Sequence, residues 1–165
     1  MAGILRRAPL EDMTDERFND MVDIDLVGVL RLFRSAPARM TDGGAMVAAS
    51  PIAGGHYGWE EHVHYAAAKS GLQGLCRSLA VELATRKIRV NTIIPGLIES
   101  PQSLDGNNSL GKDGLGAASS YIPWGRVDTT EECARAIRFL TSDDAAFVTG
   151  QQLIVDGGQT VRWPS

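Results

Sequence analysis

The stretch Tyr65-Ala66-Ala67-Ala68-Lys69 decides how the rest of the chain is interpreted. In a helix, its four-residue spacing places the phenol of Tyr65 and the ammonium of Lys69 one turn apart on the same face. Lowering a tyrosine pKa from about 10 to about 7 requires roughly 4 kcal/mol, about what one cation supplies at about 4 Å in an effective dielectric near 20. The pair therefore indicates a phenol that exchanges protons near neutral pH. An isolated pair of this kind is more often a core aromatic with a surface charge. Other motifs in the chain must therefore decide between the catalytic and the structural interpretation.

The composition indicates one globular domain. The chain has 165 residues, of which 44% are hydrophobic and 22% are charged. Its net charge of -4 and the lack of a basic run argue against a nucleic-acid or membrane-surface partner. The sequence shows no signal-peptide core and no long apolar span, and Cys76 and Cys133 lack metal-ligand spacing. We therefore expect a cytoplasmic protein with reduced thiols, no bound metal and no membrane segment.

Two long helices are expected. Thr14 is the predicted N-cap of the first, whose apolar stripe includes the position of Asp25. Because an unpaired buried charge is costly, Asp25 lies at the rim of the stripe or is held there for a purpose. The second helix is expected from about Val63 to Ala84, and small residues including Gly71 and Gly74 form one of its sides. That side would let another helix approach closely, from the same chain or from a second subunit.

Three buried strands are expected, at residues 45–49, 88–94 and 151–155. Thr129 and Glu132 form a predicted capping box at the start of a helix between the last two strands. Strands separated by helices of this length pair in parallel through right-handed crossovers. The pattern therefore predicts an α/β fold.

Two polar stretches are candidates for a binding site. His56, His62 and His64 lie close together, but no second cluster offers further ligands, so a substrate pocket is favoured over a metal site. Residues 101–121 are rich in glycine, serine and asparagine and have no apolar period. A loop of this length in a compact domain is typical of a substrate lid or of a disordered segment, and we expect a lid.

The order of the motifs resembles that of the short-chain dehydrogenase/reductase family over nearly all of the chain. This resemblance implies the C-terminal portion of a Rossmann-type doubly wound parallel sheet with α-β-α layers, in one partial domain over residues 1–165. The motifs that carry it are, in chain order, Ala2-Gly3-Ile4, Tyr65 with Lys69, Arg89-Val90-Asn91, Pro95-Gly96, Ile98 with Ser100, Pro123-Trp124-Gly125-Arg126-Val127, Thr149-Gly150-Gln151 and Val155-Asp156-Gly157-Gly158.

The resemblance also implies roles for individual residues. Tyr65 would be the general acid/base, Lys69 would lower its pKa and hold the nicotinamide ribose, and Ser50 would hydrogen-bond the substrate oxygen. Asp25 stands where the family usually has an asparagine that relays protons near the lysine, so it is a catalytic candidate. The nicotinamide cofactor, NAD or NADP, is expected to contact Tyr65, Lys69, Pro95, Gly96, Ile98 and Ser100.

Three departures from the family pattern matter. Pro51 occupies the position of the family's catalytic serine, which leaves Ser50 one residue early, and Ser100 stands where threonine is usual. Family members begin with a strand, a glycine-rich turn and a helix that cradle the cofactor's pyrophosphate, and nothing of this kind precedes Met1. We therefore expect an N-terminally truncated member.

The predicted function is an NAD(P)-dependent oxidoreductase that interconverts a small-molecule alcohol and a carbonyl, with Tyr65 as general acid/base. The alternative is a catalytically inactive chain that acts only as an assembly partner. Because the strand at 45–49 would become a sheet edge, we expect a homo-oligomer, a dimer or a tetramer, with little activity in the chain by itself.

Overall fold

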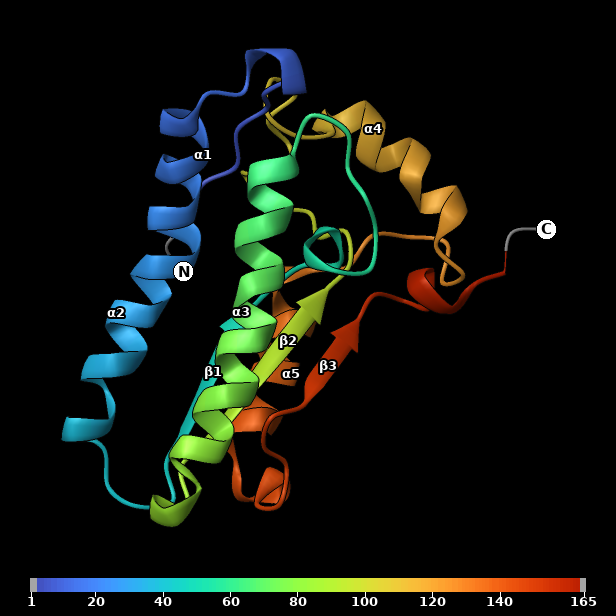
Figure 1. Ribbon diagram of the computed structural model, residues 1–165. Helices are drawn as coiled ribbons and strands as arrows, with labels where there is room; N and C mark the ends of the chain where they lie inside the picture. Colours follow the sequence, from blue (N-terminus) through green and yellow to red (C-terminus); the bar gives the residue numbers. More distant parts are fainter. Residues whose placement is uncertain (1–2, 164–165) are drawn as a thin grey trace.

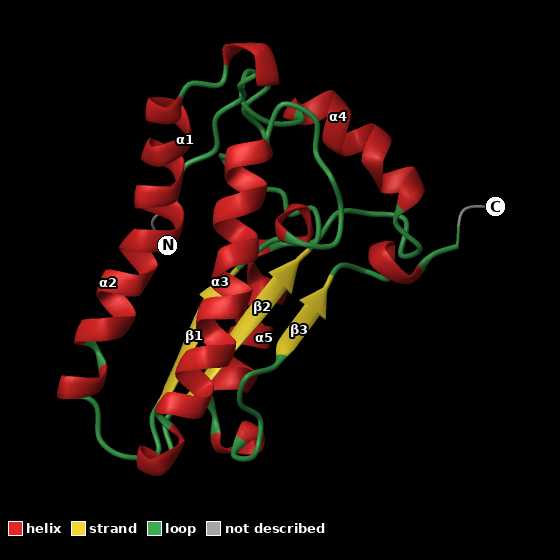
Figure 2. Ribbon diagram, in the orientation of Figure 1, coloured by secondary structure: helices red, strands yellow, loops and turns green. Residues whose placement is uncertain are grey.

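A three-stranded parallel sheet, in the order β1-β2-β3, forms the centre of the computed structural model, which describes residues 3–163 (Figure 1). Helices cover both faces, as Figure 2 shows. The helices and strands are, in chain order, α1 (Asp15–Val22), α2 (Gly28–Ser35), β1 (Ala45–Ala49), α3 (Val63–Glu82), β2 (Arg89–Pro95), α4 (Gly111–Ala118), α5 (Thr130–Thr141) and β3 (Gln152–Val155). None of the described helices is both long and apolar enough to cross a bilayer.

The sheet has the parallel register that the sequence predicts. Ala45 pairs with Arg89 and Thr92 pairs with Gln152, so β2 lies between the other two strands. Every residue of β2 is buried, because α3 covers one face of the strand and α5 lies behind the other in Figure 1. The α/β prediction with three parallel strands is therefore confirmed.

The first predicted helix is divided by a π-helical segment, Asp23–Val27, between α1 and α2. Thr14 caps α1 as expected, since its hydroxyl accepts a hydrogen bond from Arg17 N at 3.2 Å. Residues in a π-helical turn project at a different angle from those of a regular helix, and such turns often occur at functional sites. Here the turn carries Asp25, whose side chain is fully buried.

Gly71, on the side of α3 that is formed by small residues, packs against Leu26 of the same chain. A Cβ atom at this position would lie 2.7 Å from a methyl carbon of Leu26, so the π-helical segment can approach α3 only because Gly71 lacks a side chain. Gly74, one turn further on, faces open space. Of the two alternatives that the sequence left open, packing in the same chain therefore accounts for Gly71.

The expected loop at residues 101–121 contains a helix. Residues 101–110 are turns, α4 follows at Gly111–Ala118, and a short 3-10 turn spans Ser119–Tyr121. Gly114 and Gly116 lower helix propensity, so the sequence pattern indicated a loop here. Leu115 is buried, which shows that tertiary packing stabilises this short helix.

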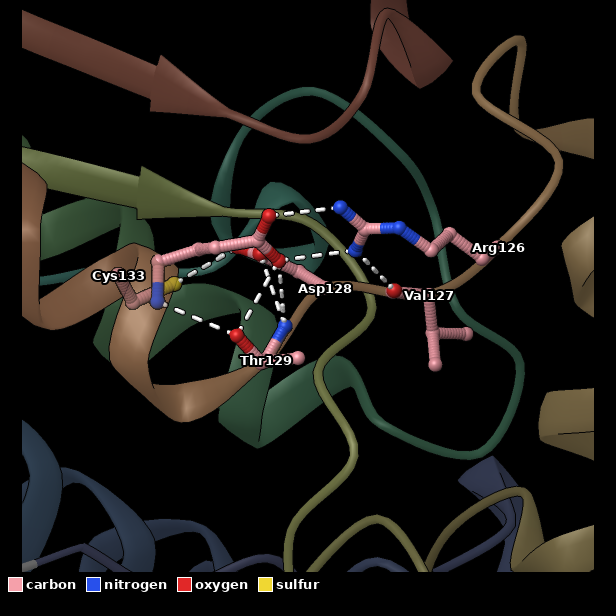
Figure 3. A network of polar contacts seen from close by, with 6 residues as sticks. Arg126, Val127, Asp128, Thr129 and Cys133 are labelled. Carbon is pink, nitrogen blue, oxygen red and sulfur yellow. Dashed lines mark hydrogen bonds and ion pairs between the residues drawn. The ribbon is translucent and has the colours of Figure 1, made fainter.

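A polar network fixes the start of α5 (Figure 3). Thr129 and Glu132 form the predicted capping box, and Arg126 donates two hydrogen bonds to the Glu132 carboxylate, at 2.6 and 2.8 Å. The Cys133 thiol donates to Asp128 Oδ2 at 3.0 Å, and burial together with this carboxylate raises the pKa of the thiol to about 12. The network holds Asp128 in place beside the segment that follows β2.

Candidate active site

A cavity of about 330 Å³ lies at the C-terminal ends of β1 and β2. Its lining includes Ala49 and Pro95, the last residues of these two strands, together with Tyr65 and Lys69 from α3. Ligands bind at this edge in open parallel sheets. The structure therefore brings the two residues that were first singled out in the sequence to the edge where a ligand is expected.

Tyr65 and Lys69 lie on one face of α3. The Lys69 ammonium is 5.4 Å from the centre of the Tyr65 ring, and both side chains contribute to the cavity wall. The ring of Tyr65 packs against Met21 of α1 and Ala68 of α3, which leaves 6% of the residue exposed. This packing fixes the ring, so the hydroxyl group has a defined position at the cavity.

Asp25, in the π-helical segment between α1 and α2, contacts Lys69. Its Oδ2 atom is 3.3 Å from Lys69 Nζ, and its Oδ1 atom accepts a hydrogen bond from the main-chain N–H of Ile4 at 2.9 Å. A Cβ atom at Gly3 would lie 3.0 Å from Asp25 Oδ1 and 3.4 Å from Lys69 Nζ. The sequence left two alternatives for Asp25, at the rim of the apolar stripe or held there for a purpose. The structure shows that its carboxylate is buried as the counter-ion of Lys69.

The charge balance around Tyr65 differs from the sequence-based argument. Burial raises the pKa of Tyr65 well above its usual value, and the negative charge of Asp25 raises it further. The sequence argument considered the cation of Lys69 alone and expected a lowered pKa. That expectation is wrong for this structure, because Asp25 offsets the lysine charge and the ring lies in an apolar environment.

Ser50 does not reach the cavity. Its hydroxyl is fully buried, donates to the Lys69 carbonyl at 2.8 Å and lies 3.3 Å from the Gln73 amide nitrogen, which donates to it. Pro51 lines the cavity instead. The proposed contact between Ser50 and a substrate oxygen is therefore not supported, because the one-residue offset turns this hydroxyl toward α3.

The expected nicotinamide-contacting residues lie together. Pro95, Gly96, Ile98 and Ser100 all line the cavity beside Tyr65 and Lys69. A Cβ atom at Gly96 would lie 2.8 Å from the Asp156 Cβ atom, so only glycine fits here.

Asp128, just before α5, anchors the segment that carries Ile98 through two main-chain hydrogen bonds. Asp128 N donates to the Leu97 carbonyl at 2.8 Å, and Glu99 N donates to the Asp128 carbonyl at 3.1 Å. The polar network of Figure 3 therefore also positions this part of the cavity wall.

The histidine-rich stretch is arranged for packing. His62 is fully buried, stacks on Trp59 with ring centres 4.0 Å apart, and places its two ring nitrogens 2.6 Å from the Glu60 carbonyl and 3.2 Å from the Asn108 carbonyl. His64 is also buried, and desolvation lowers its pKa. In residues 3–163, no group of three or more His, Cys, Asp or Glu side chains is placed to hold a metal ion.

Tyr57, Trp59 and Gln159 are among the cavity-lining residues that were not singled out in the sequence as site residues. Tyr57 and Trp59 belong to the histidine-rich loop for which a substrate pocket was favoured, so the sequence did indicate that this loop lines a cavity. Gln159 follows the glycine pair after β3, and only the three-dimensional fold brings it to the cavity. Its main-chain carbonyl accepts a hydrogen bond from the Tyr57 hydroxyl at 2.8 Å, which closes that end of the wall.

Comparison with known proteins shows the family. Residues 1–160 match the family model described as enoyl-(acyl carrier protein) reductase. The chain is 37% identical over 160 residues to trans-4-hydroxycyclohexanecarboxylate dehydrogenase of Sinomonas cyclohexanicum, covering 96% of this chain and 58% of the relative. It is 38% identical over 159 residues to the 3-oxoacyl-(acyl-carrier-protein) reductase FabG of Escherichia coli strain K12, covering 95% of this chain and 63% of the relative.

A solved structure has the same architecture. The ligand-free aldohexose dehydrogenase of Thermoplasma acidophilum superposes with a TM-score of 0.91 at 26% identity, covering 100% of this chain and 68% of the other. The chain belongs to the short-chain dehydrogenase/reductase family and has a Rossmann-type fold. It spans about three fifths of the length of the curated relatives it matches.

Proposed function

We propose that this chain carries the catalytic side of an NAD(P)-dependent oxidoreductase that interconverts an alcohol and a carbonyl. The observation that supports this most is that Tyr65, Lys69 and the segment from Pro95 to Ser100 line one cavity at the C-terminal edge of the sheet. The lining fits a nicotinamide. Pro95 and Ile98 offer apolar surface for a flat ring, Gly96 leaves the main chain open to it, and Lys69 offers donors for ribose hydroxyls.

In this proposal Tyr65 exchanges a proton with the substrate oxygen. During oxidation Tyr65, as the phenolate, takes the hydroxyl proton of the alcohol. A nicotinamide cofactor held by Lys69 and the segment from Pro95 to Ser100 would supply the redox chemistry as the hydride acceptor. Lys69 stabilises the phenolate by its positive charge, and Asp25 fixes the position of the lysine. In this mechanism Ser50 supports α3 at Lys69, and residues 101–121 act as the lid over the substrate.

Cofactor binding and turnover together test the proposal. We expect NADH or NADPH to change fluorescence on titration, and we expect Tyr65→Phe to keep this binding while it lowers the rate of alcohol oxidation by at least about 100-fold. Phe147→Leu is the control for substitution of an aromatic residue, because Phe147 is fully exposed and lies outside both the cavity and the segment 101–121. Equal rates for Tyr65→Phe and the unmodified protein would contradict the role of the phenol.

A second candidate function is that of an inactive assembly partner. One observation favours it: Pro51 lines the cavity where the family resemblance implies a catalytic serine, and the neighbouring Ser50 hydroxyl donates to the Lys69 carbonyl instead. If neither cofactor binds and no alcohol is oxidised, this candidate replaces the first.

A further inference from the structure

The charge in the cavity wall is balanced. Of the described residues that line the cavity, only Lys69 carries a charged side chain, and its ammonium lies 3.3 Å from the fully buried Asp25 carboxylate. Burying an anionic ligand is costly unless a cation and hydrogen-bond donors replace its water. Because Asp25 already pairs with Lys69 and repels a second anion, the wall favours a neutral ligand over an anionic one of the same shape.

Three hydroxyl groups of the wall are already engaged within the chain. The Tyr57 hydroxyl donates to the Gln159 carbonyl at 2.8 Å, and the Ser103 hydroxyl donates to the Ile98 carbonyl at 2.6 Å. The Ser100 hydroxyl donates to Ser103 Oγ at 3.2 Å. Since each of these groups uses its proton inside the chain, none is a free donor for a second polar group on a ligand. A ligand hydroxyl placed here would lose hydrogen bonds to water.

The indole ring of Trp59 lies beside Tyr65 in the cavity wall. It stacks on His62 with ring centres 4.0 Å apart and meets the Tyr65 ring edge-on, with ring centres 6.5 Å apart. His62 is fully buried, so the stack fixes the indole ring. If the reacting oxygen of a substrate binds at Tyr65, the carbon atoms attached to it come to lie next to Trp59.

Two aliphatic side chains extend this apolar surface. Ile52 follows β1 in a short 3-10 turn and is buried, and Leu110 is the N-cap residue of α4 and is half-buried. Both line the cavity with Trp59. Removing the hydrocarbon of a ligand from water against such side chains favours binding. The wall thus offers an apolar surface beside Tyr65, with the charge of Lys69 neutralised.

We propose that the site takes a neutral ketone or alcohol whose reacting oxygen is its only polar group, and that Ile52, Trp59 and Leu110 bind its hydrocarbon part. This inference rests on the proposed oxidoreductase function, because it places the reacting oxygen at Tyr65. It adds the class of substrate and the three side chains that determine specificity.

Three cyclohexanones that differ only at the ring position opposite the carbonyl test the inference: 4-methylcyclohexanone, 4-hydroxycyclohexanone and 4-oxocyclohexanecarboxylate. NMR titration of the intact chain, with and without NADH, gives their dissociation constants. The methyl compound is expected to bind about 3- to 10-fold more tightly than the hydroxyl compound and at least about 10-fold more tightly than the carboxylate. A carboxylate that binds as tightly as the methyl compound, or no binding of any of the three, would overturn the inference.

A cation introduced into the wall should reverse the preference. Leu110→Lys is expected to strengthen binding of the carboxylate at least about 5-fold and to weaken binding of the methyl compound. Leu104→Lys is the matched control, because Leu104 belongs to the same segment but is 42% exposed and lies outside the cavity. An equal gain in carboxylate affinity in both variants, or no gain in Leu110→Lys, would show that Leu110 does not face the ligand and would overturn the inference.

The contribution of Trp59 is tested by its truncation. Trp59→Ala is expected to weaken binding of the methyl compound about 3- to 10-fold, because the ligand loses apolar contact area. Trp163→Ala is the control, since Trp163 is 86% exposed and lies outside the cavity. If both variants bind the methyl compound as the unmodified protein does, the hydrocarbon does not lie against Trp59 and the inference is wrong.

Cofactor titration separates this inference from the proposed function. If the three ketones bind in the expected order and neither NADH nor NADPH binds, the selectivity of the cavity stands and the oxidoreductase proposal fails. If a cofactor binds and the carboxylate is turned over in preference to the methyl compound, the oxidoreductase proposal stands and this inference is overturned.

Discussion

At the residue scale, Asp25 is the buried charge that lies beside Lys69. Its carboxylate contacts the Lys69 ammonium and the main chain of Ile4, and no part of the side chain is exposed. A buried negative charge at this distance counteracts the effect of the lysine on Tyr65, whose pKa is raised by burial and by Asp25. The basicity of the phenol therefore depends on a residue from a different helix.

We predict that Asp25→Asn lowers the pKa of Tyr65. The amide removes the charge, while its oxygen can still accept the hydrogen bond from Ile4 N, so the structure is retained. Tyrosinate absorbance measured against pH, with Tyr65→Phe subtracted to isolate this ring, reports the shift. The pH profile of alcohol oxidation should move in the same direction, toward lower pH.

The matched control is Asp23→Asn. Asp23 belongs to the same π-helical segment, but its carboxylate is 65% exposed and lies 3.9 Å from Arg31. This variant should leave the titration of Tyr65 unchanged. A Tyr65 titration that is the same in Asp25→Asn and Asp23→Asn would contradict the charge balance described here.

Those residues of the candidate site that belong to a local sequence pattern could be predicted. Tyr65 and Lys69 were placed by helical periodicity, and Asp25 was singled out because a carboxylate interrupted an apolar stripe. The burial of Asp25 against Lys69 and the turn of Ser50 toward α3 depend on contacts between distant segments. Gln159 gave no local signal, since its place in the wall arises from the path of the chain after β3.

At the scale of elements, residues 101–110 are held to the rest of the fold at Ser103, whose hydroxyl donates to the Ile98 carbonyl at 2.6 Å, and at Asn108. The Asn108 side chain accepts from Arg7 N at 3.3 Å and donates to the Asp105 carboxylate at 2.9 Å, while the main-chain carbonyl of Asn108 lies 3.2 Å from His62 Nε2. The rest of the segment consists of turns. A segment of turns held at these two positions suits a lid over the cavity.

We predict that a broadly specific protease such as subtilisin first cleaves the chain within residues 101–121. Turns with few buried apolar contacts open locally more easily than packed helices and strands. Mass spectrometry of early fragments identifies the sites, and NADH or NADPH should slow the cleavage if the segment closes over the cavity. First cuts at α3 or at the sheet would contradict the assignment of this segment as the lid.

The capping network of α5 predicts a pH-dependent stability. Hydrogen bonds from Arg126 hold the pKa of Glu132 well below its usual range. A carboxylate with a lowered folded-state pKa stabilises the fold above its unfolded pKa of about 4.3, and the contribution is lost as the pH falls below that value. Glu132→Gln should therefore lower the Tm by a few degrees at neutral pH, and this difference should shrink below about pH 4.

Glu131→Gln is the control for this comparison, since Glu131 occupies the same helical turn without an Arg126 contact. Thermal unfolding followed by circular dichroism at several pH values gives the Tm of each variant. A Tm difference for Glu132→Gln that is constant from neutral to acidic pH would exclude the charged interaction as its cause.

The whole molecule has an open sheet edge. β1 pairs with β2 on one side, and no strand in residues 3–163 pairs with its other side. Large apolar side chains are exposed elsewhere on the surface, namely Trp124, Phe147, Val161 and Trp163. Edges and apolar patches of this kind are sites of association.

We predict that the chain associates in solution, with a mass by light scattering of at least twice that of one chain. Ala45→Lys, at the start of β1, should shift the population toward monomer because a charge on an edge strand opposes strand pairing. Ala134→Lys is the control, since Ala134 is exposed on α5. A monomer in the unmodified protein would show that the edge does not drive association.

The overall architecture was predictable because parallel strands and crossover helices leave strong local patterns. The strand at residues 45–49 was placed without error, and the other two were placed within one residue at each end. The π-helical segment and α4 were not predicted, because helix propensity gives no signal for the first and opposes the second. Tertiary packing decides both.

The contacts of residues 3–8 have a practical consequence for protein engineering. Gly3 lies beside Asp25 and Lys69, Ile4 and Leu5 line the cavity, and Ala8 N donates to the Glu61 carbonyl at 2.9 Å. A purification tag, cleavage scar or fusion partner placed before Gly3 would emerge within reach of the catalytic pair. Assays of Tyr65 and Lys69 variants should therefore compare proteins that carry different sequences before Gly3, before any effect is assigned to a point mutation.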